Sequence, residues 1–163
     1  MPSSNPDSAP EARRDMTDAV SGFIAVIEAE RLTPEARLAQ LAPALDRLSL
    51  AFYEGSDIEN APNEAEPPER DYAAQRQMVA ARFPDLGYYG SAPPGEGLDA
   101  DVVIGDAVDD LTDIYSEMLD VAWCLAHASL EDAVRLFRFG FTHHWGRHVC
   151  DLRGAVHYEL FGM

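Results

Sequence analysis

Two histidines and a carboxylate stand close together near the end of this 163-residue chain, in types and spacing that could bind a metal ion. On one helix His144 and His148 would share a face, because residues four apart lie one above the other, and Asp151 would follow within the next turn. Two imidazoles and one carboxylate can hold Zn²⁺ or non-haem Fe²⁺. Such ligands usually come from more than one element. The spacing therefore first indicates a structural pair of core histidines, with metal binding and proton transfer as alternatives.

The pattern around the two histidines is apolar. We expect both imidazoles to lie buried in an apolar helical stripe, where an unsatisfied polar group costs about 1–3 kcal/mol. Each ring would then need a carboxylate, a backbone carbonyl or an ion beside it. The stripe extends to both sides of the histidines through Phe137, Phe141, Leu152 and Ala155.

A row of acids on an earlier predicted helix is the second candidate site. Asp110, Asp113 and Glu117 share a face through their spacing of three and four residues. Similar rows bind Mg²⁺ in helical nucleotide pyrophosphatases, but this chain has neither a second acidic row nor a basic cluster for phosphate. The row lies nearly opposite the apolar stripe of its own helix, so we predict a solvated face. The exception would be Asp110 or Asp113 turning inward to meet His144 or His148 and raising the pKa of that histidine.

The elements that would position these residues are helices, and the hydrophobic pattern predicts an all-α bundle of four to five helices. Pro43 should bend or interrupt the second helix, and Gly140 and Gly146 should either kink the last one or admit a close neighbour. Val102–Ile104 is interpreted as an extended lead into a helix, since no second strand pattern exists to pair with it. The predicted helices cover about 15–31, 33–52, 69–83, 106–127 and 129–160.

One helical domain is expected over residues 15–163. Residues 1–14 are rich in proline, serine and charge, which predicts a disordered N-terminal tail. Residues 54–68 are rich in proline and acids, which predicts a solvated acidic linker between helices.

The charge balance restricts the partners. The chain has 29 acidic and 12 basic residues and therefore a net charge of -17. This charge repels nucleic acids and anionic membrane surfaces, so we expect neither as a partner. A basic protein partner or metal cations are favoured instead. Cys124 and Cys150 are far apart and are expected to be free thiols. The sequence shows no signal-peptide pattern and no apolar run of about 18 residues, so we expect a cytoplasmic protein.

Five motifs follow one another between about residues 16 and 158. They are Phe83-Pro84-x-Leu86-x-Tyr88-Tyr89, Asp109-Asp110-Leu111-x-Asp113-Ile114-Tyr115, Asp132-Ala133-Val134, Phe137-Arg138-Phe139-Gly140-Phe141 and His144-Trp145-Gly146-x-His148. In this combination the chain resembles the bacterial Domain of Unknown Function 5063 family, although phenylalanines replace a common Trp-x-Trp before the histidines. The resemblance implies a small helical bacterial protein, with no particular activity, substrate or cofactor. It places Asp110, Asp113, Tyr115, His144, Trp145 and His148 at the signature positions.

The leading hypothesis is a non-enzymatic accessory or protein-interaction module. In it these six residues form a structural Asp/His/Tyr cluster, and the acidic surface or the loop 88–97 meets a protein partner.

The alternative is a metal-dependent hydrolase. Its divalent metal would be held by Asp110, Asp113, His144, His148 and Asp151, and Tyr115 would donate to the developing anion. A nucleic-acid mimic is a further alternative based on charge. The sequence leaves open whether the chain is an enzyme and whether it forms a homo-oligomer.

Overall fold

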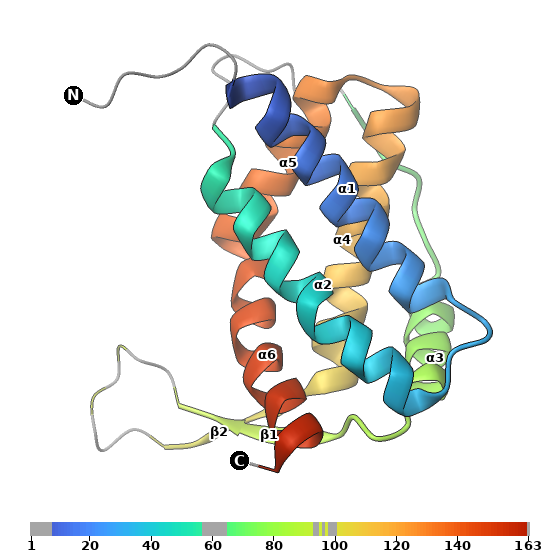
Figure 1. Cartoon of the computed structure of the whole chain (residues 1–163), viewed down its shortest axis with the longest axis vertical. Helices are drawn as coiled ribbons and strands as arrows, with labels where there is room; N and C mark the ends of the chain where they lie inside the picture. Colours follow the sequence, from blue (N-terminus) through green and yellow to red (C-terminus); the bar gives the residue numbers. More distant parts are fainter. Residues whose placement is uncertain (1–7, 57–64, 93–94, 96, 98–100, 163) are drawn as a thin grey trace.

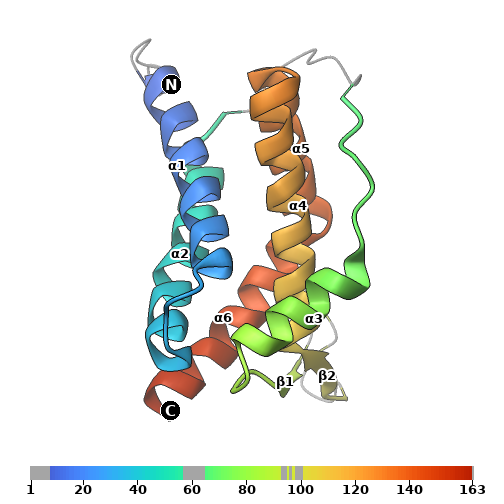
Figure 2. The ribbon, with the colours of Figure 1, turned by 90° about the vertical axis from the view of Figure 1, so that its right-hand side faces the viewer.

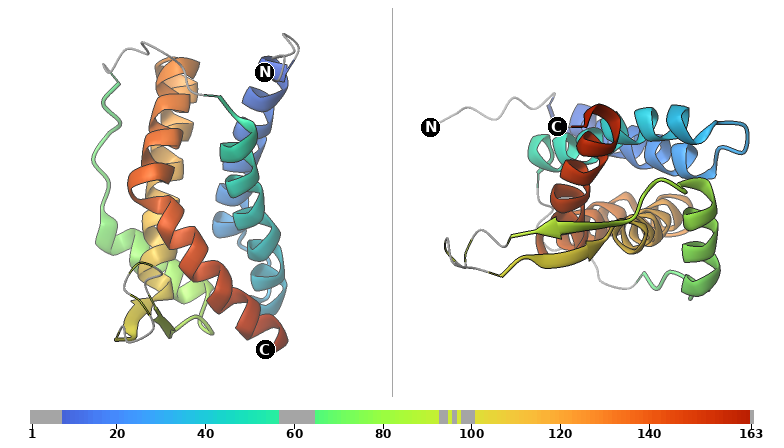
Figure 3. Two further views of the ribbon diagram at one scale, coloured as in Figure 1. Left: turned by 90° about the vertical axis from the view of Figure 1, so that its left-hand side faces the viewer. Right: turned by 90° about the horizontal axis from the view of Figure 1, so that it is seen from below.

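The helices form two layers that lie side by side (Figure 2). In the computed structural model, which describes residues 8–56, 65–92, 95, 97 and 101–162, α1 (Ser8–Glu28) and α2 (Pro34–Glu54) form one layer as an antiparallel pair (Figure 1). The second layer contains α4 (Ala107–His127) and α5 (Leu130–His143). The last helix, α6 (Trp145–Phe161), runs diagonally from the second layer towards α2 (Figure 3). The short helix α3 (Tyr72–Arg82) packs against α4.

The core lies between the two layers and explains the helical pattern of the sequence. Each long helix turns one apolar stripe inward, so burial of that stripe drives the packing. Ser129 caps α5 by accepting a hydrogen bond from the backbone N–H of Asp132 at 3.0 Å. The largest fully buried side chains include Phe23, Ile27, Leu41, Leu45, Leu48, Leu111, Ile114, Met118, Phe137, Trp145 and Leu152. The expected all-α class is confirmed, with six helices in the described residues instead of four or five.

A buried arginine fixes the turn between α1 and α2. Arg37 is only 3% exposed, and its guanidinium donates to the backbone carbonyls of Val26 (2.9 Å), Ile27 (3.3 Å), Ala29 (2.5 Å) and Leu32 (3.5 Å). The carbonyls of Val26 and Ile27 belong to the last turn of α1, where no partner remains within the helix, and those of Ala29 and Leu32 belong to the connection to α2. A cation placed there also offsets the negative end of the helix dipole.

We predict that Arg37→Leu lowers the free energy of unfolding by about 3 kcal/mol, because charge-assisted hydrogen bonds are lost and carbonyls stay buried without a donor. Urea denaturation measures the change. Arg47→Leu removes the same charge from an exposed position of the same helix and should alter stability by less than about 0.5 kcal/mol. Equal losses in the two variants would contradict the structural role of Arg37.

A two-stranded antiparallel hairpin closes one end of the bundle (Figure 1). Its strands are β1 (Tyr88–Ser91) and β2 (Val103–Asp106), with Tyr88 opposite Asp106 and Ser91 opposite Val103. The interpretation of Val102–Ile104 as an extended lead without a partner strand is therefore wrong. Four residues are too few to show alternation, and an isolated hairpin is marginally stable. Here the helices hold it through side chains of β1.

Two further sequence predictions differ from the structure. Residues 8–14 of the predicted disordered tail belong to α1, and residues 1–7 lie outside the described residues. Pro43 does not interrupt α2, which is continuous from Pro34 to Glu54. Of the predicted acidic linker, residues 57–64 lie outside the described part, residues 65–68 form neither helix nor strand, as expected, and Glu54 ends α2. Among the helices of the described residues, none combines the length and the apolar character needed to cross a lipid bilayer.

Candidate metal centre

The two histidines lie at a helix junction and not on one continuous helix. The single helix predicted for 129–160 is wrong, because α5 ends at His143 and α6 begins at Trp145, with His144 between them at φ −147° and ψ −86°. The break falls two residues before Gly146, and α5 continues through Gly140. A Cβ atom on Gly146 would lie 2.2 Å from the backbone oxygen of Phe141, so only glycine fits where the start of α6 approaches the end of α5.

Trp145 anchors this junction in the core. Its side chain is fully buried, packs against the rings of Phe137 and Phe141, and donates from Nε1 to the backbone oxygen of Phe137 at 3.2 Å. Because Trp145 cannot move without opening the core, the residues on either side of it are held firmly. The indole therefore has a structural role and lies beneath the histidines.

Three electron-pair donor atoms converge beside the junction. Nε2 of His144 and Nε2 of His148 lie 3.3 Å apart, and Oδ2 of Asp113 on α4 lies 3.5 Å from His148 and 3.9 Å from His144. All the donor atoms lie within 4.8 Å of one another, as expected of the ligands of one metal ion. Asp113 therefore turns inward to the histidines, which was the stated exception to a solvated acidic face.

Each imidazole is oriented by a carboxylate on its other nitrogen. Nδ1 of His148 shares a hydrogen bond of 2.7 Å with Asp110 Oδ1, and Nδ1 of His144 is hydrogen-bonded to Glu117 Oε1. A proton held at Nδ1 leaves Nε2 of the neutral ring as a lone-pair donor. Histidine ligands of metal ions usually have such a carboxylate partner, which fixes the ring and its tautomer.

Asp110 orients the imidazole of His148 and is not one of the three converging donor residues. Its carboxylate is buried, and its second oxygen accepts a hydrogen bond from the hydroxyl of Tyr89 on β1. Burial, and then the hydrogen bond to Asp110, raise the pKa of Tyr89, so the phenol keeps its proton and remains a donor. Asp110, which the sequence placed among the metal ligands, therefore lies outside the group of converging donor atoms.

Two other residues of the predicted site lie elsewhere. Asp151 accepts a hydrogen bond from Ser91 Oγ at 3.2 Å and pairs with Arg147 at 3.3 Å, so it fixes the hairpin to α6. Tyr115 donates to Glu28 Oε1 at 2.7 Å, across the layer interface towards α1. Neither side chain joins the converging donor atoms in the structure.

Sequence reasoning missed two partners of the centre. Glu117 appeared in the acidic row but not among the site residues, and its spacing from Asp113 was the available signal. Tyr89 had no local signal, because its contact with Asp110 depends on the hairpin. Desolvation raises the pKa of Glu117, against the lowering effect of the nearby imidazole of His144.

The centre opens to solvent on one side. The side chain of His144 is 53% exposed, whereas those of His148 and Asp113 are 23% and 21% exposed. The expectation that both rings are buried in an apolar stripe is wrong for His144, because the chain breaks there and turns the ring outward. The open side leaves room for water or another small molecule beside the three donor atoms.

Comparison with known proteins identifies the family. A family model described as "Domain of unknown function (DUF5063)" matches residues 8–161, nearly the whole chain. The chain belongs to the DUF5063 family. This confirms the resemblance that the motifs indicated.

A solved structure supports the fold of this DUF5063 protein. The crystal structure of protein BF1032 from Bacteroides fragilis superimposes with a TM-score of 0.76, at 17% sequence identity and over 94% of each chain. At this identity the likeness concerns the fold alone. None of the curated proteins matches the chain.

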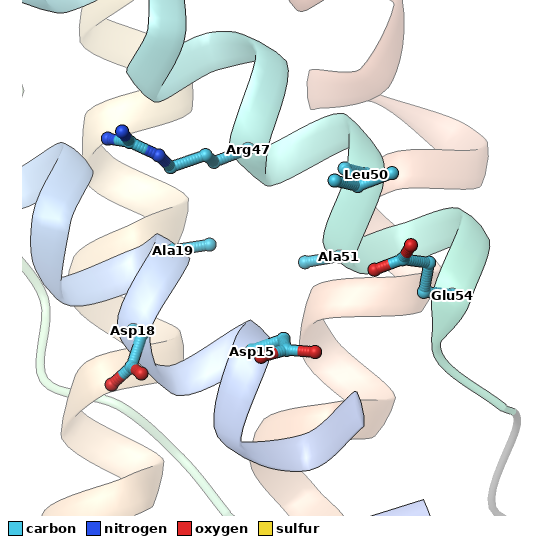
Figure 4. A pocket seen from close by; sticks show the side chains of 7 residues that line it. All are labelled: Asp15, Asp18, Ala19, Arg47, Leu50, Ala51 and Glu54. Carbon is cyan, nitrogen blue, oxygen red and sulfur yellow. The ribbon is translucent and has the colours of Figure 1, made fainter. Parts of the chain in front are cut away.

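The DUF5063 protein also has a hollow of about 450 Å³ between α1 and α2, far from the histidines in the sequence (Figure 4). Asp15 and Asp18 line it from α1, and Arg47 and Glu54 from α2. Its carboxylates share the space with an arginine and with no histidine. It therefore lacks the nitrogen ligands of the centre formed by Asp113, His144 and His148.

The hydrogen bond that Asp110 accepts from Nδ1 of His148 predicts a pH effect in the metal-free protein. It is the largest of the effects that raise the pKa of His148 above its ordinary 6.5. A group whose pKa is raised by folding stabilises the folded state fully below its unfolded pKa, and that contribution is lost as the pH rises through the folded pKa. Asp110→Asn should therefore lower the pKa of His148 and remove this contribution at acidic pH.

NMR titration of the His148 ring measures the pKa directly. Asp109→Asn is the matched control, since Asp109 bonds to Tyr72 and Arg76 on α3 and not to the histidine. An unchanged titration of His148 in Asp110→Asn would contradict the orienting role of this carboxylate.

Proposed function

We propose that this DUF5063 protein binds a divalent transition metal through Asp113, His144 and His148. The convergence of the two Nε2 atoms and the Asp113 oxygen at separations of 3.3, 3.5 and 3.9 Å is the observation that supports it most. Around a tetrahedral Zn²⁺ with bonds of about 2.0–2.2 Å, neighbouring ligand atoms lie roughly 3.3–3.6 Å apart. A small shift of the exposed His144 would bring the longest separation into this range.

A purely structural role for His144 and His148 explains their arrangement less well than metal binding does. Each ring already has a carboxylate on Nδ1, so the 3.3 Å contact between the two Nε2 atoms is a hydrogen bond only when one ring carries a proton on both nitrogens. Two lone pairs and a carboxylate oxygen with no donor between them repel one another, and a cation relieves that repulsion. The net charge of -17 also raises the local concentration of cations.

The donor set favours Zn²⁺, Fe²⁺ or Mn²⁺ over Mg²⁺ or Ca²⁺, because imidazole nitrogen suits the first group and oxygen-only sites suit the second. A metal bound here would supply Lewis acidity and a water of lowered pKa, which makes hydrolysis the reaction class that fits best. In that role Asp110 and Glu117 hold the imidazoles, and Tyr89 holds Asp110.

The test is a calorimetric titration of metal-free protein with Zn²⁺, repeated with Mn²⁺ and Fe²⁺ without oxygen. We expect one equivalent to bind to the wild-type protein and none to His144→Ala/His148→Ala. The matched control is His143→Ala/His157→Ala, which removes two exposed histidines and should bind like wild type. Binding by the first double variant with unchanged stoichiometry and affinity would refute the assignment. Hydrolysis of p-nitrophenyl esters or phosphates by the zinc-loaded protein then tests the reaction class.

A protein-interaction module is the second candidate function, and one observation favours it. Tyr88, Val102, Val103 and Ile104 of the hairpin region are more than half exposed, and such large apolar side chains often mark a contact surface. A basic partner would suit the acidic chain, and a nucleic acid would not.

A further inference from the structure

A second pocket lies between the hairpin and the end of α6. Its volume is about 280 Å³, slightly less than is usual for a site that encloses a whole drug-sized molecule, so it suits a single side chain. The hairpin side contributes residues 86–90, and α4 contributes Ala107. The side formed by α6 contributes Ala155, Tyr158 and Glu159. We call it the tyrosine pocket.

The lining of the tyrosine pocket selects for positive charge. Of the described residues that line it, Glu159 is the only acidic one, and no arginine, lysine or histidine is among them. Tyr88 and Tyr158 are 78% and 61% exposed, so their rings are available to a ligand. Aromatic faces attract cations, and a carboxylate beside them adds a direct ionic partner.

The unpaired edge of β1 beside the pocket suits a ligand with an extended backbone. In the described part of the molecule the sheet has only two strands, so the side of β1 that faces away from β2 has no neighbouring strand. The pocket is lined by β1 and by no residue of β2. An extended segment that pairs with this free edge could direct alternate side chains towards the pocket.

We propose that the tyrosine pocket binds a lysine or arginine side chain from an extended segment of a partner polypeptide. The aromatic rings of Tyr88 and Tyr158 contact the cation or its apolar stem, and Glu159 pairs with the charge. The free edge of β1 supplies backbone hydrogen bonds on either side. Asp113, His144 and His148 do not line the pocket, so peptide binding can be measured in metal-free protein and tests this proposal separately from the metal site.

The experiment uses the full chain and a capped five-residue peptide with valines flanking a central arginine. Calorimetry gives the affinity, and ¹H–¹⁵N NMR shifts locate the site. We expect binding with shifts at residues 86–90 and 155–159. The same peptide with citrulline, a neutral isostere of arginine, should bind about five-fold more weakly or worse, which corresponds to about 1 kcal/mol.

Variants assign the effect to the pocket. Glu159→Gln should reduce the ratio of arginine-peptide affinity to citrulline-peptide affinity to about two or less. The control Glu66→Gln removes the same charge from another exposed position and should leave this ratio unchanged. Tyr158→Leu should weaken the arginine peptide about three-fold, and Tyr158→Phe, which keeps the ring face, should not.

Four results would overturn the proposal. The first three are equal affinities for the two peptides, NMR shifts confined to other faces, and equal losses in Glu66→Gln and Glu159→Gln, which would indicate attraction to the overall charge. Free arginine amide binding as tightly as the peptide would show a small-molecule site and would also overturn the peptide assignment.

Discussion

Zinc added to metal-free protein at about 1,000 times its dissociation constant should increase the free energy of unfolding by about 4 kcal/mol. For a domain of this size the melting temperature should rise by about 10 °C. The reason is that the converged donors exist only in the folded state, because Asp113 comes from α4 and the histidines from the α5–α6 junction. Circular dichroism or calorimetry with and without the metal measures the shift.

His148→Ala should remove nearly all of this zinc-dependent increase. The relevant quantity is the shift on adding zinc, since loss of the imidazole also leaves the buried Asp110 with one partner fewer and lowers the starting stability. His143→Ala is the control. His143 is exposed, stacks on Phe139 and bonds to its backbone oxygen, so its loss should leave the zinc shift intact. A full zinc shift in His148→Ala would exclude the proposed centre.

Gly146→Ala should lower the free energy of unfolding by about 3 kcal/mol and should weaken zinc binding at the same time. The added Cβ would overlap the backbone oxygen of Phe141, which cannot move without shifting α5. The junction between α5 and α6 would have to open. This would move His144, which lies at the junction, relative to His148 on α6. Urea denaturation and zinc titration of the same variant measure the two effects.

Gly154→Ala is the matched control on the same helix. A Cβ at Gly154 meets no atom within 4 Å, so alanine should stabilise α6 by up to about 1 kcal/mol through its higher helix propensity. Zinc affinity should not change. If Gly146→Ala were as stable as wild type, the close approach at the junction would not be a real constraint.

The helical core could be predicted from sequence because it depends on local periodicity. The stripes of α1, α2 and α4 follow the 3.6-residue repeat, and most of their buried residues lie on or next to the stripe that the pattern selects. The break at His144 could not be located in this way. The apolar pattern continues through it, and the reason for the break is the contact between Gly146 and Phe141, which sequence spacing does not show.

The candidate site was predictable in its residue types but not in its geometry. Asp113, His144 and His148 were all named in advance, since a carboxylate row and a histidine pair are visible in the sequence. Tyr115 was assigned to the site but faces the other way. It follows Asp113 by two residues on α4, which is a rotation of roughly 200° about the helix axis, and so lies on the opposite face. Asp151 was misplaced because the contact with Ser91 depends on a hairpin that the sequence did not reveal.

The hydroxyl of Tyr89 ties the hairpin to the same carboxylate that orients His148. A molecule that holds β1 in place therefore also holds Asp110, and through it the ring that would bind the metal. If binding at β1 strengthens metal binding, thermodynamic reciprocity requires that the metal strengthen the capture of that molecule by the same factor. Tyr89→Phe, which keeps the ring and cuts the link, separates the two events.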